Sequence, residues 1–431
     1  MAKSGAVILL RYGAGSMQLL LVFNKRGKFI FLSVLLLALT GCSEQLESDN
    51  SLEAIHERVR TLDTHVDIHE DMSFDPVFDP GTLTSQQVDL PKMEAGGLDS
   101  AFFIVWVAQT ARSEADYAIA KERAIRKFRA IHRMTEHYPD RIGLAYSPQQ
   151  YKEIADSGRK VAMIGIENGF IIGKDLSLVE DYYNRGARYM TLAHNGHNDI
   201  CDSSQPSATL GDAEEEHGGV SEFGFRVIDE MNRLGMMVDI SHVSIKCMMQ
   251  ATEYSKAPVI ASHSGVWKLA KHPRNLNDEQ LRKIAESGGV VQIVGLGEFV
   301  KHDPERYAAI SKLDKAVAAL YGDDKWVRQK HAQTPEYIKG MEELNANYSP
   351  EGNLKDFVDH IDYAVKLMGI DHVGIVSDFD GGGGVEGWRN AGETMNVTAE
   401  LISRGYNEEE IAKIWSGNTL RVWSMVEKNA T

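Results

Sequence analysis

The chain has 431 residues, of which 46 are basic and 62 acidic, giving a formal net charge of −16 with histidine neutral. Its 43% hydrophobic and 25% charged residues are ordinary for a globular protein, which excludes a disordered chain and a polytopic membrane protein. The acidic balance excludes sequence-independent binding to nucleic acid, because that requires a basic face. Three cysteines are too few for a disulfide framework.

The first part of the chain has the pattern of an export signal. A basic cluster at Asn24–Lys28 precedes an apolar run at Phe29–Thr40, which is too short to span a bilayer comfortably. The run ends in Leu39-Thr40-Gly41-Cys42 and is followed by polar residues. This ending resembles the lipobox of bacterial lipoproteins, in which the cysteine is acylated and becomes the first residue of the mature chain.

We therefore expect residues 1–42 to be a lipoprotein signal peptide and residues 43–55 a linker. The mature protein is expected to be exported and held at a membrane, facing the periplasm or the cell surface, by acyl chains on Cys42. An ordinary signal peptide with a chance cysteine is the alternative. Met17 is an alternative start of translation.

After this leader, short apolar runs alternate with amphipathic segments. Continuous apolar runs suit strands that are buried on both faces of a parallel sheet. Eight runs are expected to be strands: Thr61–Ile68, Ser100–Ala108, Lys160–Asn168, Arg188–His194, Met236–His242, Ala257–Ser264, Gly289–Leu296 and His372–Asp378. Strand–helix alternation repeated about eight times predicts a single (β/α)8 TIM barrel over residues 56–431. A doubly wound sheet is the alternative, but no GxGxxG follows the first run.

The connection before the last strand is far longer than the others. It carries helical patterns at Asp303–Tyr321, Trp326–Gln333 and Thr334–Asn345, so extra helices are expected over one end of the barrel. Between the other strands, helices are expected at Arg112–Tyr138, Ser221–Leu234, Asn277–Ser287 and Phe357–Met368.

Titratable residues stand at the carboxyl ends of six expected strands. They are His65, Asp67, Glu167, His194, His242, His263 and Asp378. In a barrel these ends converge on one face, where active sites are built. A buried charge must be paired or bound to metal, and so many such residues are hard to explain as capping accidents.

The residue types narrow the chemistry of this face. His65 and Asp67 are two apart on one strand, so both side chains point the same way. Histidines with carboxylates and no neighbouring cysteine suit Zn²⁺ or another borderline divalent metal. Glu167 could bridge two ions about 3.5–4 Å apart that share a hydroxide, with Asp378 as its general base. No Gly-x-Ser-x-Gly stands at a strand end, which disfavours a covalent nucleophile.

Seven segments share a pattern of order and spacing with a known family. They are Leu62–Ile68, Tyr189–His194, Met237–His242, Pro258–Ser264, Arg274–Leu276, Ser377–Gly381 and Gly417–Val422. Together they resemble the membrane (renal-type) dipeptidases of the amidohydrolase superfamily. The resemblance covers nearly everything after about Ser51.

The resemblance implies two Zn²⁺ ions per chain. It implies that His65 and Asp67 hold one ion, that His242 and His263 hold the other, and that Glu167 bridges them.

Three further roles are implied by the resemblance. His194 would contact the scissile group and steady the tetrahedral intermediate. Arg274 would bind the C-terminal carboxylate of the substrate through its guanidinium fork. Asp378 would take a proton from the bridging water and pass it to the leaving amine.

The sequence thus predicts a zinc-dependent dipeptidase acting on free dipeptides, with tolerance of a D-residue at the C-terminal position left open. The alternatives are another binuclear amidohydrolase (a lactonase, phosphotriesterase or deaminase) and a non-catalytic peptide-binding lipoprotein. Members of the family are often dimers, so a homodimer that uses Asp303–Asn347 is also considered. Cys201 and Cys247 could form a disulfide in an exported protein or stay reduced.

Overall fold

Parallel strands form one sheet in the computed structural model, which describes residues 50–431 apart from 323–326, 328–330, 332 and 350. The strands are β1 Leu62–Asp67, β2 Ser100–Trp106, β3 Ile142–Leu144, β4 Lys160–Glu167, β5 Ala187–Thr191, β6 Met237–Asp239, β7 Ile260–Ser264, β8 Val290–Val294 and β9 Val373–Val376. Their order is β1-β2-β4-β5-β6-β7-β8-β9, and β3 lies off this path against β4. The backbone N–H of Asp67 donates to the carbonyl of Phe379 at 2.9 Å, which joins β1 to the end of β9. The predicted barrel is therefore confirmed.

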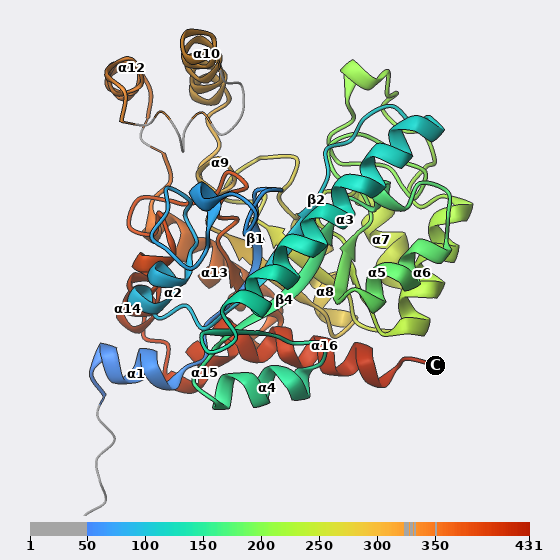
Figure 1. The fold of residues 1–431 in the computed structure, drawn as a ribbon, viewed down its shortest axis with the longest axis horizontal. Helices are drawn as coiled ribbons and strands as arrows, with labels where there is room; N and C mark the ends of the chain where they lie inside the picture. The colour runs from blue at the N-terminus through green and yellow to red at the C-terminus, as the bar shows by residue number, and fades with distance from the viewer. Residues whose placement is uncertain (1–49, 323–326, 328–330, 332, 350) are drawn as a thin grey trace, which may run out of the picture. The chain divides into compact units, whose positions relative to one another are not determined.

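Helices connect successive strands and surround them (Figure 1). Their bounds are α1 Leu52–Arg58, α2 Leu90–Gly96, α3 Glu114–His137, α4 Pro148–Asp156, α5 Ser177–Asn184, α6 Glu222–Leu234, α7 Ile245–Tyr254, α8 Asp278–Glu286, α9 Gly297–Val300, α10 Pro304–Tyr321, α12 Pro335–Asn347, α13 Leu354–Met368, α14 Thr394–Ser403, α15 Glu408–Ala412 and α16 Asn418–Lys428. Shorter helical turns are η1 Pro76–Phe78, η2 Gly169–Ile172, η3 Ala208–Leu210, η4 Ile370–His372, η5 Ala391–Glu393 and the π-helical η6 Lys413–Gly417.

Local signals explain where the predicted helices begin and end. The Ser221 side chain accepts the backbone N–H of Gly224 and caps α6, which ends at Gly235 in the left-handed conformation. Asn277 caps α8 in a capping box with Gln280. Strand β3 was not predicted, because three residues are too few to give a recognisable apolar run.

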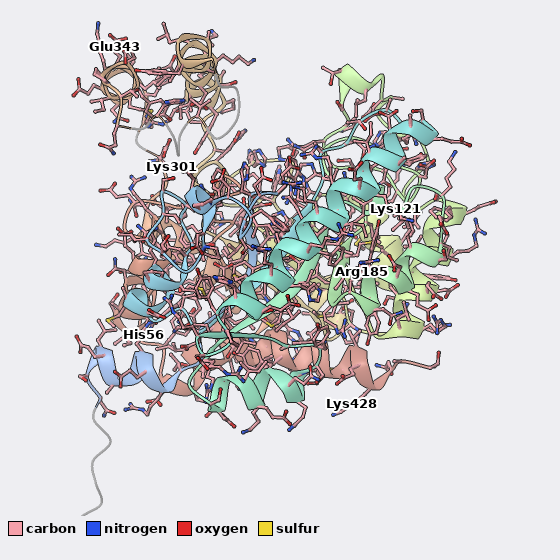
Figure 2. The ribbon with its side chains drawn as sticks, viewed as in Figure 1. His56, Lys121, Arg185, Lys301, Glu343 and Lys428 are labelled. Carbon is pink, nitrogen blue, oxygen red and sulfur yellow. The ribbon has the colours of Figure 1, made fainter. Side chains whose placement is uncertain are left out.

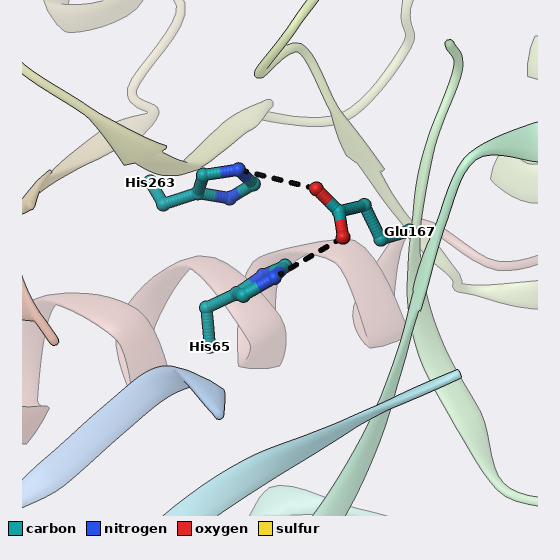
Figure 3. A group of neighbouring side chains, drawn as sticks. All are labelled: His65, Glu167 and His263. Carbon is teal, nitrogen blue, oxygen red and sulfur yellow. Dashed lines mark ion pairs between the residues drawn. The ribbon is translucent and has the colours of Figure 1, made fainter. Parts of the chain in front are cut away.

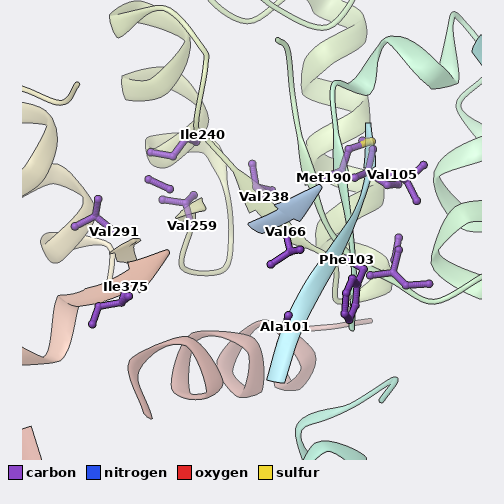
Figure 4. Close-up of a cluster of buried hydrophobic side chains, with 14 of the residues drawn as sticks. Val66, Ala101, Phe103, Val105, Met190, Val238, Ile240, Val259, Val291 and Ile375 are labelled. Atoms are coloured by element: carbon purple, nitrogen blue, oxygen red, sulfur yellow. The ribbon is translucent and has the colours of Figure 1, made fainter. Parts of the chain in front are cut away.

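Alternate residues of β2 face two different cores. Ala101, Phe103 and Val105 belong to the cluster between the strands and the outer helices (Figure 4). Phe102 faces the inside of the barrel, where Trp423 of α16 packs on it edge to face with ring centroids 6.0 Å apart. The residues of this inner cluster lie near the starts of the strands, so α16 fills the amino-terminal end of the barrel and the carboxyl-terminal end is left for a site.

The extra helices predicted between the last two barrel strands are present. Helices α10 and α12 lie side by side between β8 and β9, with Val317 and Tyr337 buried between them (Figure 1). Most of the predicted helix Trp326–Gln333 lies outside the described residues.

Two other sequence expectations concern the leader and the cysteines. Residues 1–49 lie outside the described residues, so the signal peptide, most of the linker and the lipid anchor stay predictions. Cys201 and Cys247 are both buried and form no disulfide in the structure, which corresponds to the reduced alternative. Among the described helices, none has the length and apolar character needed to cross a membrane.

His360 on α13 is a buried neutral histidine that makes folding sensitive to acid. Its Nδ1 accepts the backbone N–H of Val266 and its Nε2–H donates to the carbonyl of Val300, both at 3.0 Å. Burial lowers the pKa of His360 from 6.5 to about 4, although the bond to Val300 opposes the shift. Because the folded pKa lies below the unfolded one, the stability that this ring contributes is present above pH 6.5 and lost as the pH falls towards 4.

We expect acidification from pH 7 to pH 5 to cost about 2 kcal/mol through His360. Denaturant midpoints of the wild type and of His360→Gln, measured at both pH values, isolate this contribution. The variant should be less stable at pH 7 but lose less on acidification. The same loss in both proteins would contradict the assignment.

Candidate metal centre and active site

The predicted ligands converge around the carboxylate of Glu167, the last residue of β4. Its Oε1 lies 2.9 Å from Nε2 of His242 and 3.4 Å from Nε2 of both His194 and His263. Its Oε2 lies 3.5 Å from Nε2 of His65. Figure 3 shows His65 and His263 approaching different oxygens of this one carboxylate. The two oxygens of Glu167 therefore face different sets of histidines.

The side chains of this centre lie at or just after the carboxyl ends of the barrel strands. His65 lies in β1 and His263 in β7, whereas His242 and Asp378 follow β6 and β9. His242 and Asp378 have φ of 67° and 60°, a conformation that residues other than glycine adopt at a cost. Such strain at two strand ends is typical of functional positions.

The hydrogen bonds of His65 fix its tautomer. The hydroxyl of Tyr189 donates to the carbonyl of Thr64 at 2.9 Å, so its oxygen accepts a hydrogen bond from the Nδ1–H of His65 at 3.0 Å. Nε2 of His65 then carries a lone pair. That atom is buried and has no hydrogen-bond partner in the described structure.

His263 and His242 are oriented in the same way. Ser262 donates its hydroxyl to Asp239 at 2.6 Å, so its oxygen accepts the Nδ1–H of His263 at 2.9 Å. Nδ1 of His242 donates to the side-chain carbonyl of Asn195 at 3.2 Å. Both rings therefore direct Nε2 lone pairs towards Glu167.

This donor set fits a divalent cation. The Nε2 atoms of His242 and His263 are 2.8 Å apart, and two facing lone pairs at that distance repel unless a cation lies between them. On the other side, Nε2 of His65 lies 3.6 Å from Asp67 Oδ2 and 3.8 Å from Asp378 Oδ1. Imidazole and carboxylate ligands at such spacings are those that zinc and similar metals take in proteins.

The carboxylates of the centre are strongly perturbed. Burial opposes ionisation of Glu167, but the surrounding histidines outweigh it and hold its pKa well below the usual range. Burial raises the pKa of Asp378 well above its usual range; His65 opposes the rise, and Asp67 and Glu167 add to it. Asp378 is therefore a carboxyl group poised to carry a proton.

A cavity of about 750 Å³ opens over this centre. It is of the size that small-molecule sites have. Its walls include Trp106, Lys127, Glu167, His194, His242, His263, Arg274, Glu298, Phe299, Asp314, Val327 and Asp378. Asp314 belongs to α10, so the inserted helices reach the rim of the cavity.

Comparison with known proteins decides the family. The model of the membrane dipeptidases, peptidase family M19, matches residues 50–431. The chain belongs to the membrane dipeptidase family. It is thus a metal-dependent dipeptidase with an amidohydrolase-type barrel, as the sequence motifs predicted.

Individual relatives agree with this membership. The dipeptidase is 31% identical to dipeptidase aclJ of Aspergillus oryzae over 79% of this chain and 70% of that protein. It is 29% identical to dipeptidase tcpJ of Claviceps purpurea over 83% of this chain and 73% of that protein. The solved structure of the probable dipeptidase PvdM from Pseudomonas aeruginosa superposes with a TM-score of 0.77, at 32% identity, covering 88% of this chain and 98% of that one.

Arg274 of the dipeptidase is a buried cation at the edge of the centre. Its Nη2 donates to the carbonyl of His263 at 3.1 Å, and its guanidinium lies 5.3 Å from the ring centroid of Phe299. Burial lowers its pKa to about 10, so the group stays charged at neutral pH. Within the described residues no carboxylate pairs with it, and its Nε has no hydrogen-bond partner, so the group can still bind an anion in the cavity.

A second cluster of His272, Glu298 and His302 was not predicted. Their ligand atoms lie within 4.8 Å of one another beside the cavity. However, Nδ1 of His272 accepts the backbone N–H of Arg274 at 3.2 Å, so the neutral ring carries its proton on Nε2, the atom that faces Glu298. A protonated nitrogen is not a ligand, and this cluster does not fit a metal as the first one does.

The sequence missed the residues that orient the histidines. Tyr189 lies three strands away from His65 in the order of the sheet, and Asn195 follows the strand next to that of His242. Ser262 is the neighbour of His263 in the chain. The contact between Ser262 and His263 is local in the sequence, whereas the contacts of Tyr189 and Asn195 arise only because the closed barrel brings them to His65 and His242.

Proposed function

We propose that this dipeptidase hydrolyses free dipeptides with two Zn²⁺ ions. His65 and Asp67 would hold one ion, His242 and His263 the other, and Glu167 would lie between them. The observation that carries the proposal is that the two oxygens of buried Glu167 face His65 on one side and His242 and His263 on the other. When bound, the ions would polarise the scissile carbonyl and supply a hydroxide that they share.

The chain's own residues would position the substrate and move its proton. Arg274 would bind the C-terminal carboxylate, since it lines the cavity and its guanidinium has no carboxylate partner among the described residues. His194 would donate to the oxygen that becomes negative in the transition state, because its ring lies against His242 at 4.2 Å between centroids and is partly exposed to the cavity. Asp378 would accept a proton from the attacking water and deliver it to the departing amine.

We also propose that a D-residue is accepted at the C-terminal position. Arg274 recognises the α-carboxylate, a group that both enantiomers present. The cavity of about 750 Å³ is large enough for either arrangement of the side chain.

We also propose, from the sequence, where the protein is located and that it forms a homodimer. The motif Leu39-Thr40-Gly41-Cys42 supports an exported lipoprotein that is anchored to a membrane through Cys42. The exposed apolar side chains of Leu320 on α10 and Ile338 on α12 support a homodimer that uses the inserted helices.

The function is tested by metal content and turnover together. Purified protein, stripped with a chelator and reloaded with zinc, should bind two equivalents and regain hydrolysis of L-alanyl-L-alanine and L-alanyl-D-alanine. His242→Asn should lower the zinc content, whereas the control His302→Asn, in the neighbouring cluster, should keep two equivalents. One equivalent in the wild type, or no hydrolysis after reloading, would overturn the proposal.

A further inference from the structure

Lys127 is a buried cation that the proposed chemistry does not use. It lies on α3, and only 4% of its surface is exposed. In the part of the chain that the structure describes, its ammonium group has no ion pair or hydrogen bond, and its contact is with the ring of Trp106. By contrast, Lys121 on the same helix extends into solvent (Figure 2). A buried charge without a partner is costly, and such a group calls for an anion from elsewhere.

The ammonium of Lys127 faces the cavity of the active site. Lys127 lines that cavity, and its Nζ lies 5.5 Å from the ring centroid of Trp106, which lines it too. Burial lowers its pKa, whereas Asp67 and Glu167 across the cavity oppose that shift. If Asp67 and Glu167 bind metal, their negative charge is neutralised. They then no longer stabilise the positive charge of Lys127.

Arg123, the neighbouring cation on α3, already has a carboxylate partner. Arg123, one helical turn before Lys127, also lines the cavity, but its Nε is paired with Glu70 at 3.0 Å. Of the two described basic residues that α3 contributes to the cavity, Lys127 is thus the one without a carboxylate partner.

Lys127 and Arg274 lie on opposite sides of the centre. Lys127 is on the helix that follows β2, and Arg274 is in the loop that follows β7. In the order β1-β2-β4-β5-β6-β7-β8-β9, β2 and β7 are separated by the same number of strands in either direction around the barrel. A dipeptide whose C-terminal carboxylate binds Arg274, with its peptide bond over Glu167, therefore places its N-terminal residue towards Lys127.

We propose that Lys127 forms a subsite for an acidic N-terminal residue, binding the side-chain carboxylate of an aspartyl or glutamyl dipeptide. This inference rests on the proposed function, because it needs the substrate to lie between Arg274 and the metal centre. An ammonium group on a flexible stem suits a carboxylate that approaches from one side.

The test compares zinc-loaded wild type and variants on aspartyl-alanine, glutamyl-alanine and asparaginyl-alanine. We expect wild-type kcat/KM for the better acidic substrate to exceed that for asparaginyl-alanine by about tenfold or more, through a lower KM. In Lys127→Met the ratio should fall to about one, because methionine keeps most of the length and removes the charge. The control Lys121→Met should keep the wild-type ratio.

The outcomes separate this inference from the proposed function. Hydrolysis of all three dipeptides at equal kcat/KM by the wild type, or an acidic preference that persists in Lys127→Met, overturns the subsite and leaves the dipeptidase chemistry standing. Failure of the zinc-loaded wild type to cleave any dipeptide overturns the proposed function itself. Should Lys127→Met fail to fold, the wild-type ratio and Lys127→Gln still decide the matter.

Discussion

Replacing Asp378 by asparagine is expected to keep the metal and lower kcat for a free dipeptide by about 100- to 10,000-fold. Asparagine has the shape of aspartate but cannot take up and release a proton at the reaction centre. The backbone should tolerate the change, because asparagine is among the residues that adopt the positive φ of 60° found at this position. The loss should therefore report proton transfer and not misfolding.

Zinc content and steady-state kinetics of Asp378→Asn, measured on the same sample, check this expectation. Glu298→Gln is the matched control, because Glu298 is another carboxylate of the cavity wall that lies outside the metal centre. Its kcat should change by no more than a few-fold. If Asp378→Asn loses zinc together with activity, Asp378 is a ligand, as its place beside His65 and Asp67 would also allow. Full activity would remove it from proton transfer altogether.

The barrel, and the convergence of the predicted ligand side chains on Glu167, could be predicted because both follow from local sequence patterns. Six of the eight apolar runs carry a titratable residue at the carboxyl end, as with Glu167 at the end of β4. A closed parallel barrel then requires those ends to meet, whatever the details of packing. Strand β3 and the contact between Tyr189 and His65 depend on pairing between distant parts of the chain. No local sequence pattern predicts them.

The role of Lys127 is predictable from the sequence only in part. The sequence predicts the long helix at Arg112–Tyr138 but assigns no role to Lys127 within it. The buried residues of α3 include Ala120, Ala124, Ile131 and Met134, and Lys127 falls on that same face at helical spacing. A charged residue on the apolar face of an amphipathic helix is a signal that the sequence does contain, although only the structure shows that its ammonium faces the active-site cavity.

Replacing Arg274 by methionine is expected to lower kcat/KM for free dipeptides by about 10- to 100-fold, chiefly by raising KM. The guanidinium is buried without a carboxylate partner in the described structure, so its removal leaves no protein anion unpaired. For dipeptides with an amidated C-terminus, which carry no carboxylate for the fork to bind, the same change should cost less than about threefold.

Arg274→Lys separates charge from geometry at this position. A lysine keeps the positive charge but cannot offer two parallel N–H donors, so its kcat/KM on free dipeptides should lie between those of wild type and Arg274→Met. Parallel assays on free and amidated forms of one dipeptide make the comparison independent of enzyme concentration. Equal losses on the two forms would mean that Arg274 acts through its bond to the carbonyl of His263, at 3.1 Å, and shapes the metal centre instead of binding the substrate.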